Sequence, residues 1–361
     1  MVTLGDLRRY AVARTLFAST RLGDAIEKLG FLQADPIRAP ARAQDLTLRL
    51  RVKNYRAGDL ERKYPTLPIE EDFFVNYGFL PRRHQVLMHP RVPRRKLKPS
   101  MQSRAQAILD FVLEHGPAHP RQIDEHFAHG RVTNYWGGSS NATTHLLDDM
   151  HYRGLLRVVR RDRGIRVYVA HQHAPAPRDI PGRRQLLDTL VDVIVHTYAP
   201  LPAATLRTLV LRRLRYGVPQ LMGMLDAALN RAKRRLAYAR IDGAEWYWPE
   251  SERPESARHE IDDQVRLLAP FDPIAWDRLR FEILWGWRYR FEAYTPVRKR
   301  KLGYYSLPLL WRDDVIGWAN LSVNDGALVG NFGYVTRAPR AREFRRELEA
   351  ELARMWSFLR V

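Results

Sequence analysis

Apolar side chains at helical spacing divide the first part of the chain into short helices. The spacing predicts helices over residues 3–18, 21–29, 36–50 and 55–64. Gly30 is a typical helix stop, and it is followed at once by Phe31-Leu32 and the triplet Gln33-Ala34-Asp35. A mixed apolar and aromatic run near residues 70–80 predicts strands that complete this first unit.

A second stretch shows three helical periods followed by alternating residues. Helices are expected over residues 101–115, 120–127 and 141–153. Strands over 155–161 and 165–169 flank Asp162-Arg163-Gly164, which is typical turn chemistry. Three helices closed by a two-stranded ribbon are the plan of a winged helix, in which a helix or the ribbon meets DNA. The basic residues near this hairpin tip are expected to contact phosphate: Arg157, Arg160 and Arg161.

The same order of elements recurs further along the chain. Helices are expected over residues 183–198, 202–213 and 218–230, with strands over 235–240 and 245–248. Proline-rich segments at 90–99 and 173–182 are interpreted as linkers. We therefore expect three winged-helix-like units in series, over residues 1–98, 99–175 and 180–258.

The last section, residues 259–361, changes character. It is rich in aromatic and β-forming residues, with turn signals at 298–303 and 313–314. This pattern predicts a small β-barrel or curled sheet, closed by an amphipathic helix over 338–359. The expected fold class is α+β, with tandem winged-helix domains and a C-terminal small β-barrel.

The balance of charged residues indicates what kind of molecule the protein binds. The chain has 60 Lys and Arg against 40 Asp and Glu, a formal net charge of +20. Eight of the cations are lysines, so arginine supplies 60 − 8 = 52. A GC-rich genome would also raise the arginine share, but codon usage does not explain the net excess. A surplus of this size favours a polyanionic partner, most commonly nucleic acid.

Several classes of protein and site are excluded or disfavoured. The absence of cysteine excludes disulfides, thiolate zinc sites and iron–sulfur clusters. The N-terminus lacks the apolar core of a signal peptide, and no run of 18 apolar residues occurs, so we expect a cytoplasmic protein with no membrane contact. His171-x-His173 stands in a proline-rich segment without acidic neighbours and is a poor metal site. We expect no metal and no cofactor.

The triplet Gln33-Ala34-Asp35 is the first candidate for chemistry. In extended backbone, residues two apart point to the same face, so the amide and the carboxylate would lie side by side and could polarise one water. A second interpretation is that Asp35 caps a helix starting at Pro36, which is a common pattern. The two roles are compatible.

Further candidates would contact DNA. Arg298-Lys299-Arg300-Lys301 is expected to form a turn between aromatic strands, suited to phosphate contact or minor-groove probing; the alternative is a solvated turn. Arg38 and Arg42, four apart on the helix expected after the triplet, would share a face and could hold phosphates. Tyr135 and Trp136 precede a glycine- and serine-rich turn and could stack on DNA or anchor a core.

Two segments of the last section carry a resemblance to a known family. They are residues 269–278 (Ala-Pro-Phe-Asp-Pro-Ile-Ala-Trp-Asp-Arg) and 285–296 (Trp-Gly-Trp-Arg-Tyr-Arg-Phe-Glu-Ala-Tyr-Thr-Pro), the latter continuing to Trp311. Together they closely resemble the bacterial winged-helix DNA glycosylases of the YcaQ/AlkX/AlkZ type. The resemblance extends over nearly the whole chain.

The resemblance implies a C-shaped, basic cleft around duplex DNA and a catalytic Gln-x-Gln or Gln-x-Asp motif. Gln33 and Asp35 match the Gln-x-Asp version of the YcaQ/AlkX branch, which is associated with N7-alkylated purines and with unhooking of interstrand crosslinks. One departure stands at residues 73–78, Phe-Phe-Val-Asn-Tyr-Gly, where many members carry a Trp-x-His-Glu-like stretch. Substrate choice is therefore open.

The chemistry agrees with this resemblance. An N7-alkylated purine is cationic and leaves without a general acid, so one carboxylate suffices to stabilise the oxocarbenium ion and accept a proton from water. Asp35 would take that role and Gln33 would orient the water or sugar. We expect a monomeric, monofunctional DNA glycosylase acting on damaged double-stranded DNA. The alternatives are a non-catalytic winged-helix DNA-binding protein, such as a transcriptional regulator, and a structural repair adaptor.

Overall fold

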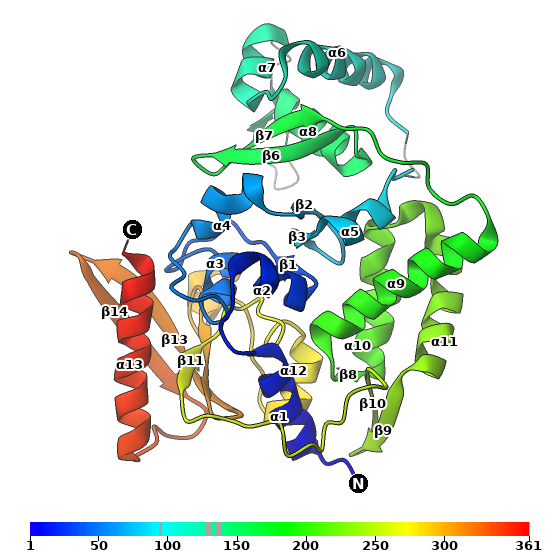
Figure 1. Cartoon of the computed structure of the whole chain (residues 1–361). Helices are drawn as coiled ribbons and strands as arrows, with labels where there is room; N and C mark the ends of the chain where they lie inside the picture. Colours follow the sequence, from blue (N-terminus) through cyan, green and yellow to red (C-terminus); the bar gives the residue numbers. More distant parts are fainter. Residues whose placement is uncertain (94–95, 128–130, 134–138, 361) are drawn as a thin grey trace.

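The structure is a computed structural model that describes residues 1–93, 96–127, 131–133 and 139–360 (Figure 1). Tyr135 and Trp136 lie outside these residues. The first unit has a small antiparallel sheet of order β1-β3-β2, close to the strands expected near 70–80. Its elements are α1 (Leu4–Thr15), α2 (Leu22–Leu29), β1 (Leu32–Gln33), α3 (Ala43–Leu48), α4 (Asp59–Lys63), β2 (Ile69–Phe73), β3 (Tyr77–Pro81) and α5 (Arg82–Gln85).

The helix expected from Pro36 to residue 50 is largely wrong. Residues 34–42 form an irregular loop, and only Ala43–Leu48 are helical. Pro40 would stand inside the expected helix, where a proline removes one backbone hydrogen bond and clashes with the preceding turn. The residues that follow the triplet therefore form a loop and not a helix.

The second unit follows the expected order of three helices and a hairpin. A further short hairpin, β4–β5, which the pattern did not predict, lies between the second and third helices. The elements are α6 (Pro99–His115), α7 (Pro120–Phe127), β4 (Arg131–Thr133), β5 (Ser139–Asn141), α8 (Ala142–Arg153), β6 (Leu156–Asp162) and β7 (Ile165–Ala170). In Figure 1 the β6–β7 hairpin lies directly over β2 and β3.

The third unit also has its helices and hairpin close to the expected positions. Asp179 caps the first helix by accepting a hydrogen bond from the Gly182 amide at 2.9 Å. Its elements are α9 (Ile180–Tyr198), β8 (Leu201–Pro202), α10 (Ala203–Thr208), α11 (Leu225–Arg235), β9 (Ala237–Ile241) and β10 (Ala244–Trp248). A π-helical turn (Leu209–Arg213) and two 3-10 turns (Leu214–Tyr216 and Pro219–Met224) connect α10 to α11.

The C-terminal section forms an open sheet, and the expected closed barrel is wrong. Four antiparallel strands run in the order β11-β12-β13-β14, so β11 and β14 are edges that each pair with one neighbour. The long helix α13 packs against β11 (Figure 1). The elements are β11 (Val265–Leu267), α12 (Arg278–Trp285), β12 (Leu307–Trp311), β13 (Asp314–Asn324), β14 (Ala327–Tyr334) and α13 (Arg342–Leu359).

The aromatic segment 276–305 is also not made of strands. Asp277 caps α12 by accepting from the Arg280 amide at 2.6 Å, and Gly286 ends the helix at φ 73°. The following residues, up to the start of β12, form an irregular loop with one short 3-10 turn. Some of its aromatic side chains belong to the core: Tyr289 is buried there, and its hydroxyl donates to the Ser306 carbonyl at 2.7 Å.

The hydrophobic cores cross the boundaries of the expected units. One core joins α1 to α9, α10, α11 and α12. A second joins α2 and α3 to α8, to the C-terminal sheet and to α13. Residues of the first unit therefore belong to both cores. Through the second core, the part of this unit that contains Gln33 packs against the C-terminal section.

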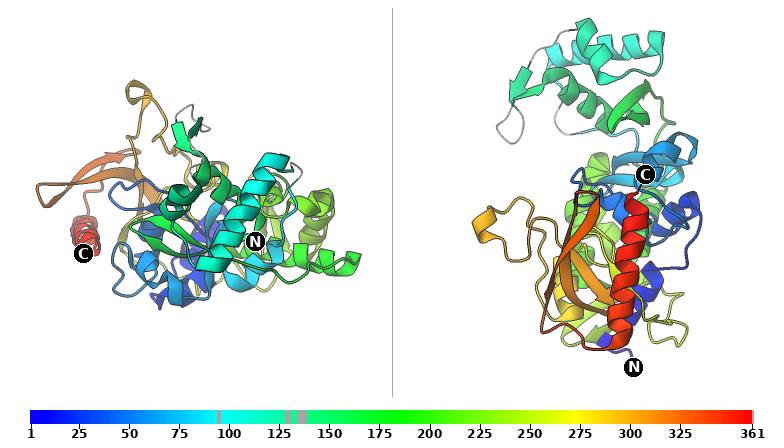
Figure 2. Two further views of the ribbon diagram at one scale, coloured as in Figure 1. Left: turned by 90° about the horizontal axis from the view of Figure 1, so that it is seen from above. Right: turned by 90° about the vertical axis from the view of Figure 1, so that its left-hand side faces the viewer.

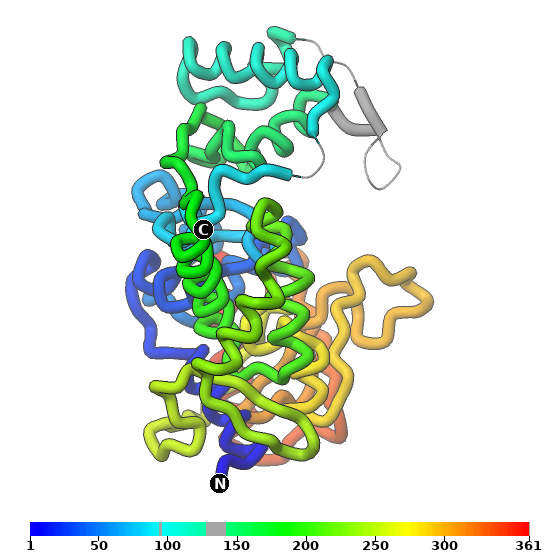
Figure 3. Tube along the Cα trace, turned by 90° about the vertical axis from the view of Figure 1, so that its right-hand side faces the viewer, coloured from blue at the N-terminus to red at the C-terminus, as the bar shows by residue number. Residues whose placement is uncertain are grey.

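The loop 286–306 projects from the body of the molecule. Both views of Figure 2 show it on the same side as the β4–β5 hairpin of the second unit. Figures 2 and 3 both place the segment that connects α1 and α2 on the opposite side. The molecule thus has one side with two projecting features of separate origin.

Candidate active site

The close approach of strands β1 and β3 determines the position of Gln33, Ala34 and Asp35. Gln33 ends β1 and stands opposite Gly78 of β3. A Cβ atom on Gly78 would lie 2.3 Å from the Leu32 carbonyl oxygen, a distance that real Cβ atoms do not adopt. The Ala34 amide continues the contact by donating to the Tyr77 carbonyl at 3.0 Å. Glycine at position 78 therefore lets β1 approach β3 and sets where Gln33 and Asp35 lie.

Gln33 is buried, with 6% of its surface exposed. Its side-chain carbonyl, Oε1, is fully covered and accepts no hydrogen bond from any described residue. An unsatisfied buried acceptor is costly, so such groups are usually partnered by water, by ligand or by substrate. Gln33 therefore presents an acceptor that the protein itself does not use.

Asp35 is held by backbone and side-chain contacts on both sides. Its amide donates to Oε1 of Gln44, in the first turn of α3, at 3.1 Å. Its Oδ1 accepts from the Ile37 amide at 2.9 Å, which closes a tight turn. No helix begins at Pro36, so the interpretation of Asp35 as a helix cap is wrong.

The electrostatic setting of Asp35 is that of a desolvated acid. Burial raises the pKa of Asp35 above its ordinary value, and the hydrogen bond from the Ile37 amide offsets part of that rise. One of its oxygens is engaged with Ile37, so the second is available for another donor. A carboxylate with a raised pKa is a better proton acceptor than an ordinary aspartate.

Two tyrosines of loop 286–306 lie within electrostatic range of Asp35, which the sequence did not indicate. The pKa of Tyr305 is raised first by burial and next by the negative charge of Asp35. The same two causes, in the same order, raise the pKa of Tyr294. Tyr305 is 2% exposed, whereas Tyr294 is 69% exposed. The loop therefore has a buried end, at Tyr305, and an outer part, at Tyr294, that faces solvent.

The basic run on this loop remains available for an external partner. Arg298, Lys299 and Lys301 are exposed, and among the described residues none of the three forms an ion pair. Arg300 turns inward, donating to the Thr295 carbonyl at 2.8 Å and lying 5.0 Å from the Tyr304 ring. The run stands on an irregular loop and not between two strands, but three cations and the exposed Val297 face solvent together.

Arg38 and Arg42 do not share a helix face. Both lie in the loop after Asp35, and both point toward Gly164 at the turn of the β6–β7 hairpin. Arg42 forms an ion pair with Glu61, whose other oxygen accepts from the Gly164 amide at 2.7 Å. Arg38 is exposed beside them. Arg42 thus joins two units, and Arg38 is the one of the pair that faces solvent.

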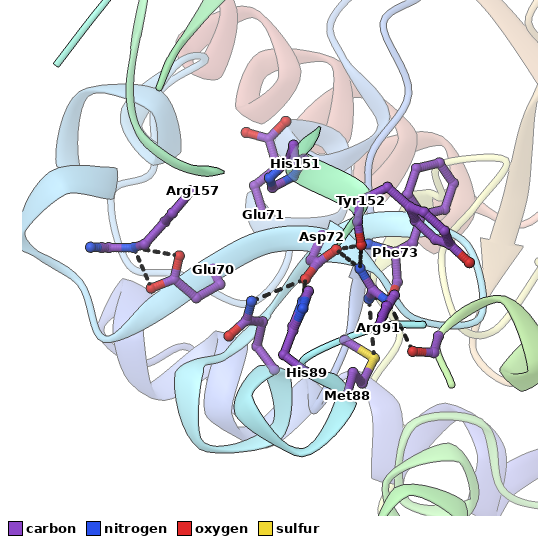
Figure 4. Close-up of polar contacts among 12 residues, drawn as sticks. Glu70, Glu71, Asp72, Phe73, Met88, His89, Arg91, His151, Tyr152 and Arg157 are labelled. Atoms are coloured by element: carbon purple, nitrogen blue, oxygen red, sulfur yellow. Dashed lines mark hydrogen bonds and ion pairs between the residues drawn. The ribbon is translucent and has the colours of Figure 1, made fainter. Parts of the chain in front are cut away.

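The arginines expected near the hairpin tip are engaged by carboxylates. Arg157 lies at the far end of β6 from the turn and pairs with Glu70 of β2 at 2.8 Å (Figure 4). Arg161 pairs with the fully buried Glu71, and Arg160 pairs with Asp162 at 3.0 Å. Burial would raise the pKa of Glu71, but Arg161 and Arg166 lower it below its ordinary value. Arg157 and Arg161 therefore dock the hairpin onto β2.

A second buried network lies behind β2. Asp72 accepts from Arg91 at 2.7 Å and contacts His89 at 2.6 Å (Figure 4). Arg91 also donates to the carbonyls of Tyr152 and Gly217, at 2.8 Å each. This network joins the first, second and third units. Sequence reasoning missed it because its members come from distant segments.

Metal-binding clusters and membrane-spanning helices are two features that the sequence does not predict. Among the described residues, no group of three or more His, Asp or Glu side chains could hold a metal ion. His171 and His173 contact each other's rings at 4.4 Å, and His173 stacks on His89. In the described part of the chain, no helix combines the length and apolar character needed to cross a bilayer.

Comparison with known proteins adds two findings. A family model described as DNA glycosylase AlkZ-like matches residues 26–358. The structure is similar to that of the DNA glycosylase AlkZ of Streptomyces sahachiroi, with a TM-score of 0.63. The two chains are 14% identical, and the match covers 99% of this chain and 96% of the other. The likeness in structure shows a shared mixed helix and sheet fold.

Proposed function

Because the chain belongs to the AlkZ-like DNA glycosylase family, we propose that it hydrolyses the N-glycosidic bond of cationic N7-alkylated purines in DNA. The observation that carries this proposal is the setting of Asp35. It is a desolvated carboxylate two residues after a buried, unpartnered amide carbonyl, and its charge acts on the tyrosines of an exposed basic loop. The residues that would act are Gln33 and Asp35.

The proposed reaction needs few groups from the protein. The oxygen of a water attacks the anomeric carbon of the damaged nucleotide while the bond from that carbon to the purine nitrogen breaks. The electron pair of the broken bond neutralises the cationic base, so no general acid is required. Asp35 stabilises the developing oxocarbenium ion and accepts a proton of the water. Gln33 orients the water through its free carbonyl.

Loop 286–306 supplies the proposed contact with DNA. Arg298, Lys299 and Lys301 would bind phosphates, and the exposed Tyr294 and Val297 offer apolar surface to a groove or an unstacked step. Arg38, three residues after Asp35 and exposed, would hold a phosphate of the damaged strand. The net charge of +20 supports association with a polyanion over the whole surface.

The proposed substrates include interstrand crosslinks, with the protein acting as a monomer and without strand cleavage. A crosslinked base cannot be turned fully into a tight pocket, so the enzyme must act with the lesion largely in place. The match of Gln33 and Asp35 to the Gln-x-Asp pattern supports this extension. Residues 73–78, which form the end of β2 and the turn into β3, adjoin Gln33 and would influence which lesions fit.

Asp35→Asn tests the proposed activity. The variant keeps the size of the side chain and an acceptor for the Ile37 amide but loses the negative charge. We expect release of 7-methylguanine from an alkylated duplex to fall at least about 100-fold, while binding to the same duplex is retained. Single-turnover base release and duplex binding are the measurements.

Asp263→Asn is the matched control, because Asp263 is an exposed carboxylate paired with Arg312 and has no contact with the site. It should release base at the wild-type rate. Unchanged release by Asp35→Asn would refute the role of this carboxylate. Absence of release by the wild type on both monoalkylated and crosslinked duplexes would instead favour a non-catalytic DNA-binding protein.

A further inference from the structure

We propose that Tyr305 is a third catalytic group, whose hydroxyl donates a hydrogen bond to the water that Asp35 activates. This inference rests on the proposed function, since it assigns a role within the same site. It goes beyond the Gln-x-Asp pattern, because Tyr305 stands 270 positions further along the chain and comes to Asp35 only in the folded structure.

The first support is an orphaned hydroxyl. Tyr305 is 2% exposed, and its ring packs edge-on against Phe291 with 5.2 Å between ring centroids. Its hydroxyl is fully covered and has no hydrogen-bond partner among the described residues. A buried phenol normally finds a partner, because an unmade hydrogen bond in the interior is costly. The ring of Tyr305 is therefore packed in the core, whereas its hydroxyl can still hydrogen-bond to water or substrate.

The second support is the position of Asp35. The carboxylate acts on Tyr305 as a nearby charge, yet no hydrogen bond joins the two side chains. Tyr305 and Leu32 belong to the same hydrophobic core, and Ala34 and Ile37, on either side of Asp35, pack against that core. A charge that acts on a buried hydroxyl without a direct hydrogen bond suits one bridging water. The other side chains that act electrostatically on Tyr305 are Tyr289, Tyr294 and Tyr304, so Asp35 is the carboxylate in this group. The Asp35 carboxylate is thus the charged group that this hydroxyl faces.

The third support is the balance of donors and acceptors. A water has two protons and two lone pairs. Asp35 and Gln33 offer two acceptors that the protein leaves free, one carboxylate oxygen and one amide carbonyl. Tyr305 offers one donor, so the three side chains satisfy two protons and one lone pair of a water between them. The remaining lone pair is the one that attacks the anomeric carbon, so the water is oriented before DNA arrives.

Tyr289 shows what a purely structural tyrosine looks like in the same segment. It is buried to a similar degree, at 3% exposure, but its hydroxyl donates to the Ser306 carbonyl at 2.7 Å. Replacing it with phenylalanine leaves that carbonyl without a donor. Replacing Tyr305 with phenylalanine breaks no hydrogen bond to the described residues. The two substitutions therefore separate packing from catalysis.

The test compares Tyr305→Phe with Tyr289→Phe on a duplex containing 7-methylguanine. We expect Tyr305→Phe to release base about 10- to 100-fold more slowly, which is the usual cost of removing one hydrogen bond next to a charge. Its melting temperature and its duplex binding should match those of the wild type. Tyr289→Phe should lower the melting temperature while the excision rate stays near that of the wild type.

A second readout follows the ionisation of Asp35 and does not depend on activity. The Tyr305 hydroxyl hydrogen-bonds to the bridging water, which in turn donates to the Asp35 carboxylate. Loss of the hydroxyl should therefore raise the pKa of Asp35 further. Carbon-13 NMR titration of the Asp35 carboxyl would show this rise in Tyr305→Phe and not in Tyr289→Phe. If Tyr305→Phe folds poorly, site-specific difluorotyrosine at position 305, which keeps the ring and the hydroxyl, should retain both excision and the wild-type Asp35 titration.

The outcomes separate this inference from the proposed function. If Asp35→Asn loses excision but Tyr305→Phe keeps the wild-type rate and the wild-type Asp35 titration, the role of Tyr305 is refuted and the function stands. If the wild type releases no base, the function fails, and the NMR titration still decides whether Tyr305 is coupled to Asp35. Loss of excision in difluorotyrosine protein with an unchanged Asp35 titration would also count against the bridging water.

Discussion

At the scale of single residues, the site combines groups that are unfavourable for folding. Burial raises the pKa of Asp35, and the polar ends of Gln33 and Tyr305 lack partners within the described chain. Such groups reduce stability unless a ligand or water completes them. The same features make the carboxylate a stronger base and leave acceptors and donors free for a reacting water.

This arrangement makes a prediction about stability and pH. A carboxyl whose folded-state pKa lies above its unfolded value of 3.8 contributes stability that is fully present below pH 3.8 and is lost as pH rises through the folded-state pKa. The charge of Asp35 therefore opposes folding at neutral pH. We expect Asp35→Asn to be more stable than the wild type at pH 7, by about 0.5–2 kcal/mol.

Urea unfolding at several pH values provides the measurement. The advantage of Asp35→Asn should shrink as pH falls toward 4, where the wild-type carboxyl becomes neutral. Asp263→Asn, at an exposed pair, should show little difference from the wild type at any pH. A destabilised Asp35→Asn at pH 7 would contradict the desolvated setting described above.

At the scale of elements, a two-residue strand determines where the chemistry lies. β1 contributes only Leu32 and Gln33, and its position depends on the absence of a side chain at Gly78 of β3. The loop after it is shaped by two prolines and by the turn at Asp35 rather than by a helix. The short strand β1, Gly78 and the loop after β1 thus determine the position of the site, while the longer helices form the cores.

Gly78→Ala should therefore displace β1. The added Cβ would meet the Leu32 carbonyl at 2.3 Å, so one strand must move by a substantial fraction of an ångström. We expect a loss of roughly 1–3 kcal/mol in the free energy of unfolding, as for other overpacked sites, together with at least tenfold slower excision. Urea unfolding and single-turnover base release would measure the two effects.

Gly223→Ala is the control, because a Cβ at Gly223 has no neighbour within 4 Å. It should change the free energy of unfolding by less than about 1 kcal/mol and leave excision intact. If Gly78→Ala behaved like Gly223→Ala, the close approach of β1 to β3 would not govern the position of Gln33.

At the scale of the whole molecule, buried ion pairs join segments that are far apart in the chain. Arg51, just after α3, binds Asp272 through two hydrogen bonds of 2.8 and 2.9 Å, and both side chains are fully buried. The buried pair of Asp72 and Arg91 lies within the first unit, and Arg91 links it to the second and third units through the carbonyls of Tyr152 and Gly217. These pairs fix the relative positions of units whose hydrophobic cores are already shared.

Removing one member of such a pair leaves an uncompensated buried charge. We expect Asp272→Asn to lower the free energy of unfolding by about 3–5 kcal/mol, because Arg51 would keep its charge in the interior. The exposed pair of Asp263 and Arg312 offers the comparison, and Asp263→Asn should cost less than about 1 kcal/mol. Equal losses in urea unfolding would show that the buried pair is not a structural joint.

Much of the architecture follows from local pattern. The helices and hairpins of the second and third units lie close to where the spacing of apolar residues predicts them, because short-range periodicity largely determines them. The predictions failed where tertiary contacts override local preference. The aromatic segment 276–305 has the composition of strands, yet it forms α12 and a loop whose rings are needed in the core. The expected barrel is an open four-stranded sheet, because residues 276–305 form α12 and a loop and add no strand to it.

The sequence by itself determined the family, the basic surplus and the candidate pair Gln33 and Asp35, because residue identity and spacing carry that information. The tertiary structure alone decided which groups surround the pair. It brought Tyr305 to Asp35, turned Arg157 and Arg161 toward Glu70 and Glu71, and left three cations of loop 286–306 facing solvent. These outcomes depend on contacts between residues separated by tens to hundreds of positions, and no local pattern encodes which distant partner each side chain will meet.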